Sequence, residues 1–356
     1  MIDMYLLLFS RILLINKMKK QNAPTMKDVA KKAGVALGTV SKVINGIPVG
    51  EEYRLKVEEA IKELNYEVNT YARGLKTNRT NIIALIIPDN INPFFSTFAH
   101  YVESALYQQK YKLMLCCSDG IREKEIEYLN LCSQNKVDGI IALTYSDIGK
   151  YVSKTIPLVS FDRHFDNNFT PMVSSDNYMG GIIATEKLLE LGCKRPAFIR
   201  FSSSIPGEAD KRKDGYFAAC QKHNITPIFL DKNVYDNAEK ELQAFICEHE
   251  NPDHTLDFDG IFSNTDLHAF KAKKILESKG YRVPEDVQII GFDGIRQFGE
   301  EELFVSSICQ PIKELANTCV SILLSNEQDT RPTLTLLPVK YEFGGTTKRE
   351  KENDYV

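Results

Sequence analysis

Short, uninterrupted runs of apolar residues recur along the chain from Asn81 onward, and each run is followed by an amphipathic segment. Strands that are apolar throughout and alternate with helices are typical of parallel sheets buried on both faces. The pattern predicts two doubly wound α/β lobes with a cleft between them, where small ligands bind. The expected strands span residues 82–87, 111–116, 139–143 and 158–161 in the first lobe, and 196–201, 228–230, 260–263 and 287–291 in the second.

The preceding segment, residues 26–65, has helical periodicity instead. Thr25 is placed to cap a first helix, and Gly34 is placed to end it. Only three residues, 34–36, separate this helix from the next, which is the spacing that a helix-turn-helix uses. The expected helices span residues 26–33, 37–45 and 50–64, and the third carries an apolar stripe made by Leu55, Val57, Ala60, Ile61 and Leu64.

Charge is distributed unevenly along the chain. Between positions 19 and 80, twelve Lys or Arg residues stand against seven Asp or Glu residues, whereas the whole chain has a net charge of −4. A basic head on an acidic body predicts that only the head meets a polyanion such as DNA. We expect an extension at 1–24 that is disordered, a helix-turn-helix domain at 25–68, a hinge at 69–80, a sensor at 81–345 and a polar tail at 346–356.

Two further features of the sequence bear on where in the cell the protein acts. The first seventeen residues are largely apolar, but Ser10 and Arg11 divide them into runs much shorter than the roughly 20 residues of a membrane span. We interpret this segment as an upstream extension or a misassigned start, with Met18 or Met26 as the true beginning, and expect no membrane association. The eight cysteines include no CxxC pair, which favours buried, reduced thiols in the cytoplasm over zinc sites or disulfides.

Four segments carry a family resemblance: MKDVAKKAGV (26–35), GTVSKVIN (38–45), VEEAIKELNY (57–66) and ARGL (72–75). They resemble the LacI/GalR family of bacterial transcriptional regulators, and the similarity is colinear from Thr25 onward. The resemblance implies a homodimeric repressor with a helix-turn-helix head and a periplasmic-binding-protein-like sensor. It implies operator DNA and a small sugar effector as partners, without a cofactor or a metal.

In this family the second helix reads operator bases, and Leu37 and Gly38 stand at base-reading positions. A leucine can touch only a thymine methyl and a glycine reads nothing, so Lys42 is the expected donor to guanine. Ala36 replaces the usual capping serine, which predicts a cap weaker by about 1 kcal/mol. The expected DNA contacts are Thr25, Leu37, Gly38, Thr39, Ser41, Lys42 and Asn45 in the head and Tyr71, Ala72, Arg73, Leu75 and Lys76 in the hinge.

The family's hinge folds into a helix only on DNA and wedges a leucine into the minor groove. Leu75 matches that leucine, and Gly74 makes the free segment a poor helix. A flexible linker in which Leu75 merely packs is the other interpretation of this segment.

Polar and aromatic residues follow several expected strands at their carboxyl ends, where open α/β sheets bind ligands. The resemblance assigns Phe94 and Phe95 to an effector loop and Arg212 to effector hydroxyls. Carboxylates with one arginine suit a neutral polyhydroxylated ligand better than a purine or a multiply charged phosphate, although Arg163, if it points inward, would leave room for a sugar phosphate. The expected effector contacts are Asp89, Asn92, Phe94, Phe95, Asp162, Arg212, Asn264, Asp266 and Asp293, although each type alone is more often a cap or turn residue.

Known catalytic motifs are missing from the sequence: it has no P-loop, GxSxG, HExxH or strand-following GxGxxG. We therefore expect no enzyme. The family resemblance implies instead a repressor of a carbohydrate-utilisation operon that a small sugar or sugar phosphate releases from DNA. Residues 160–163 and 173–177 look similar to those of sucrose- and ribose-operon repressors. The alternatives are a global catabolite regulator controlled by a phosphocarrier protein and, in another class, a sugar-binding transport protein.

Overall fold

The computed structural model divides into two compact units, residues 1–80 and 81–356. The expected hinge contacts Tyr71, Ala72, Arg73, Leu75 and Lys76 lie outside the described residues. No helix in the described part of the chain is long and apolar enough to cross a membrane. The structure describes residues 24–67, 79–146, 148–153, 155–163, 170–203, 205–234, 236–297, 302–325 and 332–349.

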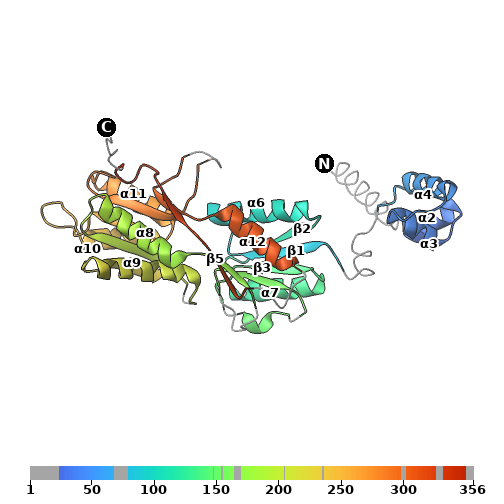
Figure 1. Cartoon of the computed structure of the whole chain (residues 1–356), viewed down its shortest axis with the longest axis horizontal. Coiled ribbons are helices and arrows are strands. Elements are labelled where there is room, and N and C mark those ends of the chain that lie inside the picture. The colour runs from blue at the N-terminus through green and yellow to red at the C-terminus, as the bar shows by residue number, and fades with distance from the viewer. Residues whose placement is uncertain are drawn as a thin grey trace, which may run out of the picture. The chain divides into compact units, whose positions relative to one another are not determined.

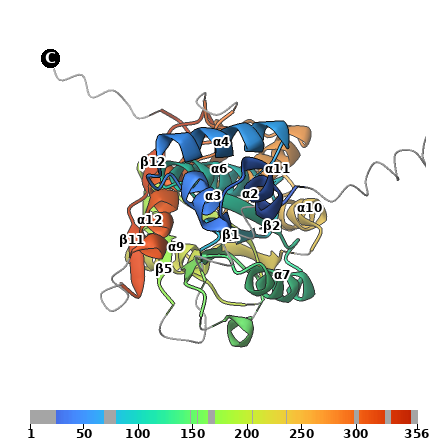
Figure 2. The same ribbon diagram turned by 90° about the vertical axis from the view of Figure 1, so that its right-hand side faces the viewer.

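The first unit is a bundle of three helices, α2 (Met26–Ala33), α3 (Leu37–Ile44) and α4 (Glu51–Glu63), in which α4 lies across the other two (Figure 2). Val29, Val40 and Val57, one from each helix, are fully buried at its centre. The three predicted helices are confirmed to within one residue at each end. The prediction was wrong for Leu55: its side chain is 53% exposed and does not belong to the buried apolar stripe of α4.

The first lobe of the second unit is built on a six-stranded parallel sheet with the order β11-β5-β4-β3-β1-β2. Alternate residues of β1 face opposite sides of this sheet: Ile83 and Leu85 pack against α6 and α12, and Ala84 and Ile86 pack against α7. Figure 1 shows α6 and α12 on one side of the sheet and α7 on the other. The elements are β1 (Ile82–Ile87), α6 (Pro93–Gln108), β2 (Lys112–Cys117), α7 (Arg122–Gln134), β3 (Gly139–Ala142), β4 (Leu158–Phe161), β5 (Met172–Ser175), α12 (Ile312–Leu324) and β11 (Leu334–Leu337), with a short 3-10 helix, η1 (Gly149–Tyr151).

The second lobe has a sheet of the order β12-β10-β9-β8-β6-β7, parallel except for the β10–β12 pair. Helices α8 and α9 cover one face and α10 and α11 cover the other. The elements are α8 (Asn177–Glu190), β6 (Pro196–Ser202), η2 (Glu208–Asp210), α9 (Lys211–Lys222), β7 (Ile228–Asn233), α10 (Ala238–Glu248), β8 (Gly260–Ser263), α11 (Asp266–Ser278), β9 (Gln288–Asp293), β10 (Ser307–Cys309) and β12 (Lys340–Glu342).

The predicted fold class of two doubly wound lobes and all eight predicted strands are confirmed, but four short strands were missed. Strands β5, β10, β11 and β12 have three or four residues each and lack a continuous apolar run. Two of them belong to a return of the chain: after β10 in the second lobe, α12 lies beside α6 in the first lobe, and β11 joins the first sheet before β12 re-enters the second (Figure 1). The lobes are therefore not two successive halves of the sequence.

The compact part of the chain continues past the predicted boundary at residue 345. Thr346 and Thr347, which the prediction placed in a polar tail, are both buried. The Thr346 hydroxyl donates to the carbonyl of Ile289 (2.7 Å) and accepts from the amide of Ser306 (2.8 Å). These bonds tie the segment to the start of β9 and to the residue before β10, which no local polarity pattern would indicate.

Candidate functional site

The turn between α2 and α3 is built by local capping. Thr25 accepts a hydrogen bond from the amide of Asp28 (3.4 Å), whose carboxylate accepts from the Thr25 amide (2.8 Å), and together they form a capping box. Gly34 ends α2 in the left-handed conformation, with φ at 66°. Ala36 precedes α3 without a side-chain cap, as predicted. Thr25, an expected DNA contact, is thus already occupied in holding α2.

Helix α3 exposes the residues that the sequence assigns to base reading. Leu37 is 42% exposed, and Gly38 and Lys42 are also exposed. Thr39 and Ser41 are half-buried. The remaining expected contact, Asn45, uses its side-chain amide to donate to the carbonyl of Ser41 (2.6 Å), which closes the last turn.

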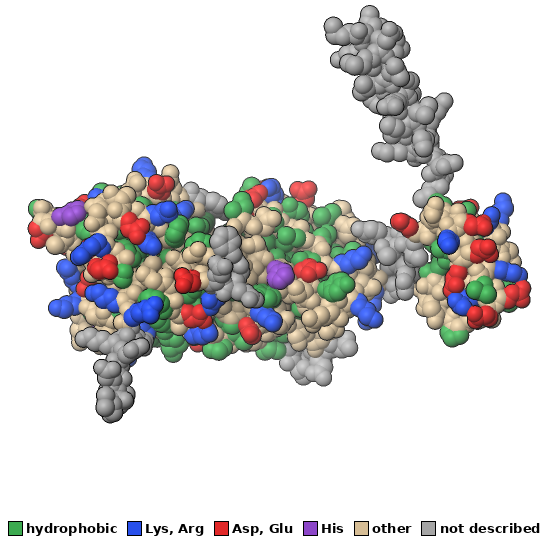
Figure 3. Space-filling view, turned by 90° about the horizontal axis from the view of Figure 1, so that it is seen from above, with side chains coloured by type: hydrophobic (Ala, Val, Ile, Leu, Met, Phe, Trp, Pro, Cys, Tyr) green, Lys and Arg blue, Asp and Glu red, His purple; other side chains and the backbone are tan. Residues whose placement is uncertain are grey.

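The basic charge of this unit is concentrated away from α4. On α4 two of the three cations are neutralised: Arg54 contacts Glu51 and Glu58, and Lys56 contacts Glu52. Acidic and basic side chains are accordingly intermixed on the visible face of the unit in Figure 3. Lys32 of α2 pairs with Glu63. The lysines that make no ion pair with any described residue are Lys27 and Lys31 on α2, Lys42 on α3 and Lys62 on α4.

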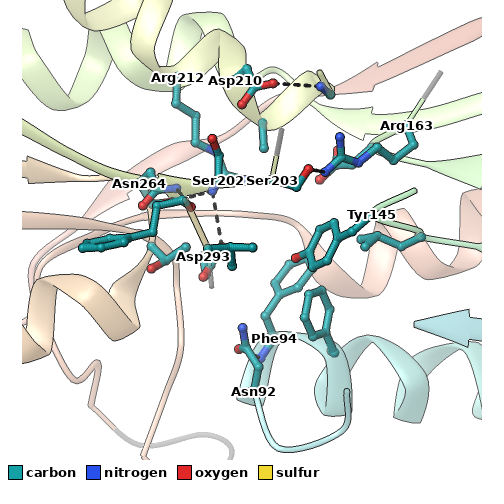
Figure 4. Close-up of a pocket in the computed structure, with 18 of the residues that line it drawn as sticks. Asn92, Phe94, Tyr145, Arg163, Ser202, Ser203, Asp210, Arg212, Asn264 and Asp293 are labelled. Carbon is teal, nitrogen blue, oxygen red and sulfur yellow. Dashed lines mark hydrogen bonds and ion pairs between the residues drawn. The ribbon is translucent and has the colours of Figure 1, made fainter. Parts of the chain in front are cut away.

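A cavity of about 750 Å³, part of it open to solvent, lies between the carboxyl ends of the two sheets (Figure 4). Its walls come from both lobes. Seven of the nine predicted effector residues line it: Asn92, Phe94, Phe95, Asp162, Arg212, Asn264 and Asp293. The loop ahead of α6 places Phe94 there, because the Asn92 side chain accepts from the amide of Phe94 (3.0 Å) and begins the helix.

Arg212 is the buried cation of this cavity, with 4% of its surface exposed. Its Nε donates to Oδ1 of Asn177 (2.7 Å), its Nη1 donates to the carbonyl of Asn264 (2.5 Å), and its guanidinium lies 3.6 Å from the ring centroid of Phe292. Asp293 lies 3.8 Å away. Burial lowers the pKa of Arg212, and the negative charges of Asp293 and Asp162 oppose that shift. The arginine remains charged because its ordinary pKa lies far above neutrality.

Two carboxylates face the cavity from strained backbone positions. Asp162 follows β4 with φ at 57°, and Asp293 ends β9 with φ at 132°, both outside the range that L-residues usually adopt. Such strain collects at ligand sites because the surrounding structure must hold it. Burial raises the pKa of both carboxyl groups, and Arg212 opposes the shift in each.

Two predicted effector residues do not line the cavity. The Asp89 carboxylate accepts from the amides of Ile91 (2.8 Å) and Asn92 (2.7 Å) and so shapes the turn. The Asp266 carboxylate is consumed by the hydroxyl of Ser307 (2.6 Å) and the amide of Ile295 (2.7 Å). Asp89 acts as a turn residue, whereas Asp266 joins α11 to the segments that follow β9 and begin β10.

Tyr145, Gln310 and Arg163 are among the lining residues that the sequence analysis missed or left open. Tyr145 follows β3, where the rule of carboxyl strand ends could have found it. Gln310 follows β10, a strand that was not predicted, and it donates to Asp293 (2.8 Å). Arg163 does line the cavity, but its guanidinium donates to the Ser203 hydroxyl (2.7 Å) and to the carbonyl of Ile205.

No group of three or more His, Cys, Asp or Glu residues in the described part of the chain could hold a metal ion. The cysteines are all free; six are buried, Cys117 is half-buried and Cys247 is exposed.

Comparisons with known proteins agree with this geometry. Residues 25–69 match the family described as bacterial regulatory proteins, lacI family, and residues 80–337 match the periplasmic binding proteins and sugar binding domain of LacI family. The chain belongs to the LacI family. This LacI-family protein is a DNA-binding transcriptional regulator rather than an enzyme, in agreement with the sequence analysis.

Relatives cover nearly the whole LacI-family chain. The ribose operon repressor of Halalkalibacterium halodurans is 35% identical over 330 residues, which are 91% of this chain and 97% of the relative. The sucrose operon repressor of Pediococcus pentosaceus is 33% identical over 331 residues, 91% of this chain and 99% of the relative.

Two solved structures show where the fold recurs. A LacI family regulator from Enterococcus faecium with bound ribose has a TM-score of 0.64 and 28% identity, and the match covers 75% of this chain and all of that one. The lac repressor dimer bound to operator and the anti-inducer ONPF shares the fold, with a TM-score of 0.77 at 21% identity, over 92% of this chain and 100% of that one.

Proposed function

We propose that this protein represses a carbohydrate-utilisation operon and that a small, neutral sugar bound between the lobes releases it from operator DNA. The relatives named as ribose and sucrose operon repressors support the class of target. The observation that carries the choice of effector is the excess of hydrogen-bond acceptors in the cavity.

Three acceptors in the cavity are left without a donor. Asp162 accepts from Ser174 through Oδ1, and Asp293 accepts from Gln310 through Oδ1; no described residue donates to the other oxygen of either carboxylate. Oδ1 of Asn264 is buried and likewise has no donor among the described residues. Each sugar hydroxyl can donate one hydrogen bond, so adjacent hydroxyls satisfy these oxygens.

A phosphate group would meet the wrong partners here. It brings only acceptors and negative charge to a wall that already holds two carboxylates. Arg212 and Arg163 are the cations of the cavity, and both guanidinium groups already donate to protein atoms. These contacts favour a free sugar over a sugar phosphate.

A panel of sugars tests this proposal. Thermal unfolding is measured with D-ribose, other pentoses, hexoses and sucrose, each with its phosphorylated counterpart, and hits are added to gel shifts on operator DNA selected from a random duplex pool. A free sugar at 100 times its Kd should stabilise the protein by about 2.7 kcal/mol and should release DNA. Tighter binding of a phosphorylated counterpart would refute the neutral effector, and no response to any sugar would refute the sugar-induced mechanism.

On the DNA side, we propose a homodimer that acts in the cytoplasm and binds a pseudo-palindromic operator. Its α3 helices would read the half-sites through Leu37 and Lys42, with Thr39 and Ser41 on phosphates, while Leu75 enters the minor groove from the hinge at residues 69–80. Light scattering should give twice the chain mass. Leu75→Ala should weaken operator binding by at least tenfold while leaving the dimer intact.

A further inference from the structure

Glu125 is a fully buried carboxylate on the inner face of α7, in the first lobe. The other buried residues of α7 are Leu129 and Cys132, and both belong to the apolar cluster between this helix and the sheet. A buried carboxylate costs free energy unless hydrogen bonds compensate it. An apolar side chain would serve the packing of this helix better, so the charge calls for another explanation.

The partner of Glu125 is the loop that forms one wall of the effector cavity. Its Oε1 accepts from the backbone amide of Tyr145 at 2.9 Å, across twenty positions of sequence. Burial raises the pKa of Glu125, and the hydrogen bond from the Tyr145 amide opposes that shift. Because Tyr145 lies beyond the end of β3, its amide has no acceptor on a neighbouring strand, and the Glu125 carboxylate accepts the hydrogen bond instead.

Tyr145 in turn contacts the residue that spans the two lobes. The Arg163 guanidinium lies 5.2 Å from the centroid of the Tyr145 ring, a cation–π distance. From there Arg163 donates to Ser203 (2.7 Å) and to the carbonyl of Ile205, both in the second lobe (Figure 4). A backbone hydrogen bond also joins the two lobes here, because the amide of Glu208 donates to the carbonyl of Asp162 (3.0 Å).

We infer that Glu125 is a positioning residue for effector binding: by holding the Tyr145 backbone, it sets one wall of the cavity and the Arg163 bridge to the second lobe. Its role in effector binding rests on the proposed function, whereas its role in the bridge does not. Glu125 does not line the cavity and acts only through Tyr145.

Hydrogen–deuterium exchange of the full chain tests the bridge without any effector. Glu125→Leu removes the acceptor, Glu125→Gln keeps an oxygen for the Tyr145 amide, and Glu127→Leu is a matched control on the exposed face of α7. In Glu125→Leu, exchange should rise about tenfold at residues 143–146 and also at 205–208 in the other lobe. Glu125→Gln should stay within twofold of the wild type, and Glu127→Leu should show no change.

Two results would overturn the inference: an increase confined to the first lobe, or an equal increase throughout both lobes, which a general loss of stability would produce. A second arm titrates D-ribose. The Kd should rise about tenfold in Glu125→Leu and recover in Glu125→Gln. If the wild type does not bind D-ribose, that result counts against ribose as the effector, while the exchange data still decide the role of Glu125 in the bridge.

Discussion

Gly181 of α8 and Gly215 of α9 lie against each other where the two helices pack. A Cβ atom on Gly181 would lie 3.1 Å from Cα of Gly215 and 2.2 Å from the carbonyl oxygen of Arg212. Because only glycine allows this approach, Nε of Arg212 reaches Oδ1 of Asn177 at the start of α8. Two residues outside the cavity therefore position its buried cation.

Gly181→Ala should disturb both the packing and the effector site. The added methyl group forces α8 and α9 apart, which should cost about 1–3 kcal/mol of stability, and should weaken effector binding because Arg212 moves. Met179→Ala, at a 44% exposed position of the same helix, is the control. Thermal unfolding and effector titration check both effects; a glycine variant with wild-type effector affinity would show that the helix contact does not set the site.

Arg212→Met should abolish effector response while leaving operator binding intact. Removal of the guanidinium takes the main compensating positive charge away from the buried Asp162 and Asp293, at a cost of about 3–5 kcal/mol. The added change Asp293→Asn should recover part of that stability but not the effector response. Gel shifts with and without effector and urea unfolding give the comparison. Recovery of effector release in the double variant would contradict the assigned role of Arg212.

His268 should make the stability of the sensor depend on pH. Burial lowers the pKa of this imidazole from 6.5 to about 4, so it stays neutral in the folded state while the unfolded chain takes up a proton. Stability is fully present above pH 6.5 and falls as the pH drops toward 4, by up to about 3 kcal/mol. Urea unfolding followed by circular dichroism, at a series of pH values, measures this loss. His268→Gln should flatten the profile in that window, and an unchanged profile would exclude His268 as its source.

Ala36→Ser should stabilise the DNA-binding unit. A serine hydroxyl can accept from a free amide in the first turn of α3, which is worth about 1 kcal/mol. The opposite change at the neighbouring helix, Thr25→Ala, should cost a similar amount because it breaks the capping box. Thermal unfolding of the DNA-binding unit, followed by circular dichroism, gives the melting temperature of each variant. If Ala36→Ser lowers the melting temperature, the turn does not tolerate the cap.

Lys42→Ala should weaken operator binding in a sequence-dependent way. If Lys42 donates to a guanine, its loss costs about 1–3 kcal/mol and relaxes the preference at one base pair. Lys62→Ala, also an unpaired lysine of the head, removes the same charge from α4. Gel shifts with operators that differ at single base pairs separate the effect of Lys42→Ala from that of Lys62→Ala. Equal, sequence-independent losses in both variants would indicate that Lys42 contacts phosphate only.

Most of the site was predictable from local sequence. A residue after an apolar strand lies at the carboxyl edge of a parallel sheet, so Asp162, Asn264 and Asp293 could be placed without tertiary information. The same rule failed for Asp89 and Asp266, because both carboxylates are used up by nearby backbone or hydroxyl donors. Whether a polar side chain faces a ligand depends on its other partners, and those are known only in the folded chain.

The recurring apolar runs by themselves determined the two α/β lobes, and the spacing of the capping residues determined the helix-turn-helix, because strand and helix periods are set by residues within about ten positions of one another. Only the tertiary structure decided which segments share a lobe. Helix α12 and strand β11 return to the first lobe, and Gln310 lines the cavity at the start of that return. Glu125 of α7 accepts a hydrogen bond from the amide of Tyr145 in the cavity wall. These contacts join residues far apart in sequence, and burial and hydrogen bonding across the assembled lobes, rather than local periodicity, bring them together.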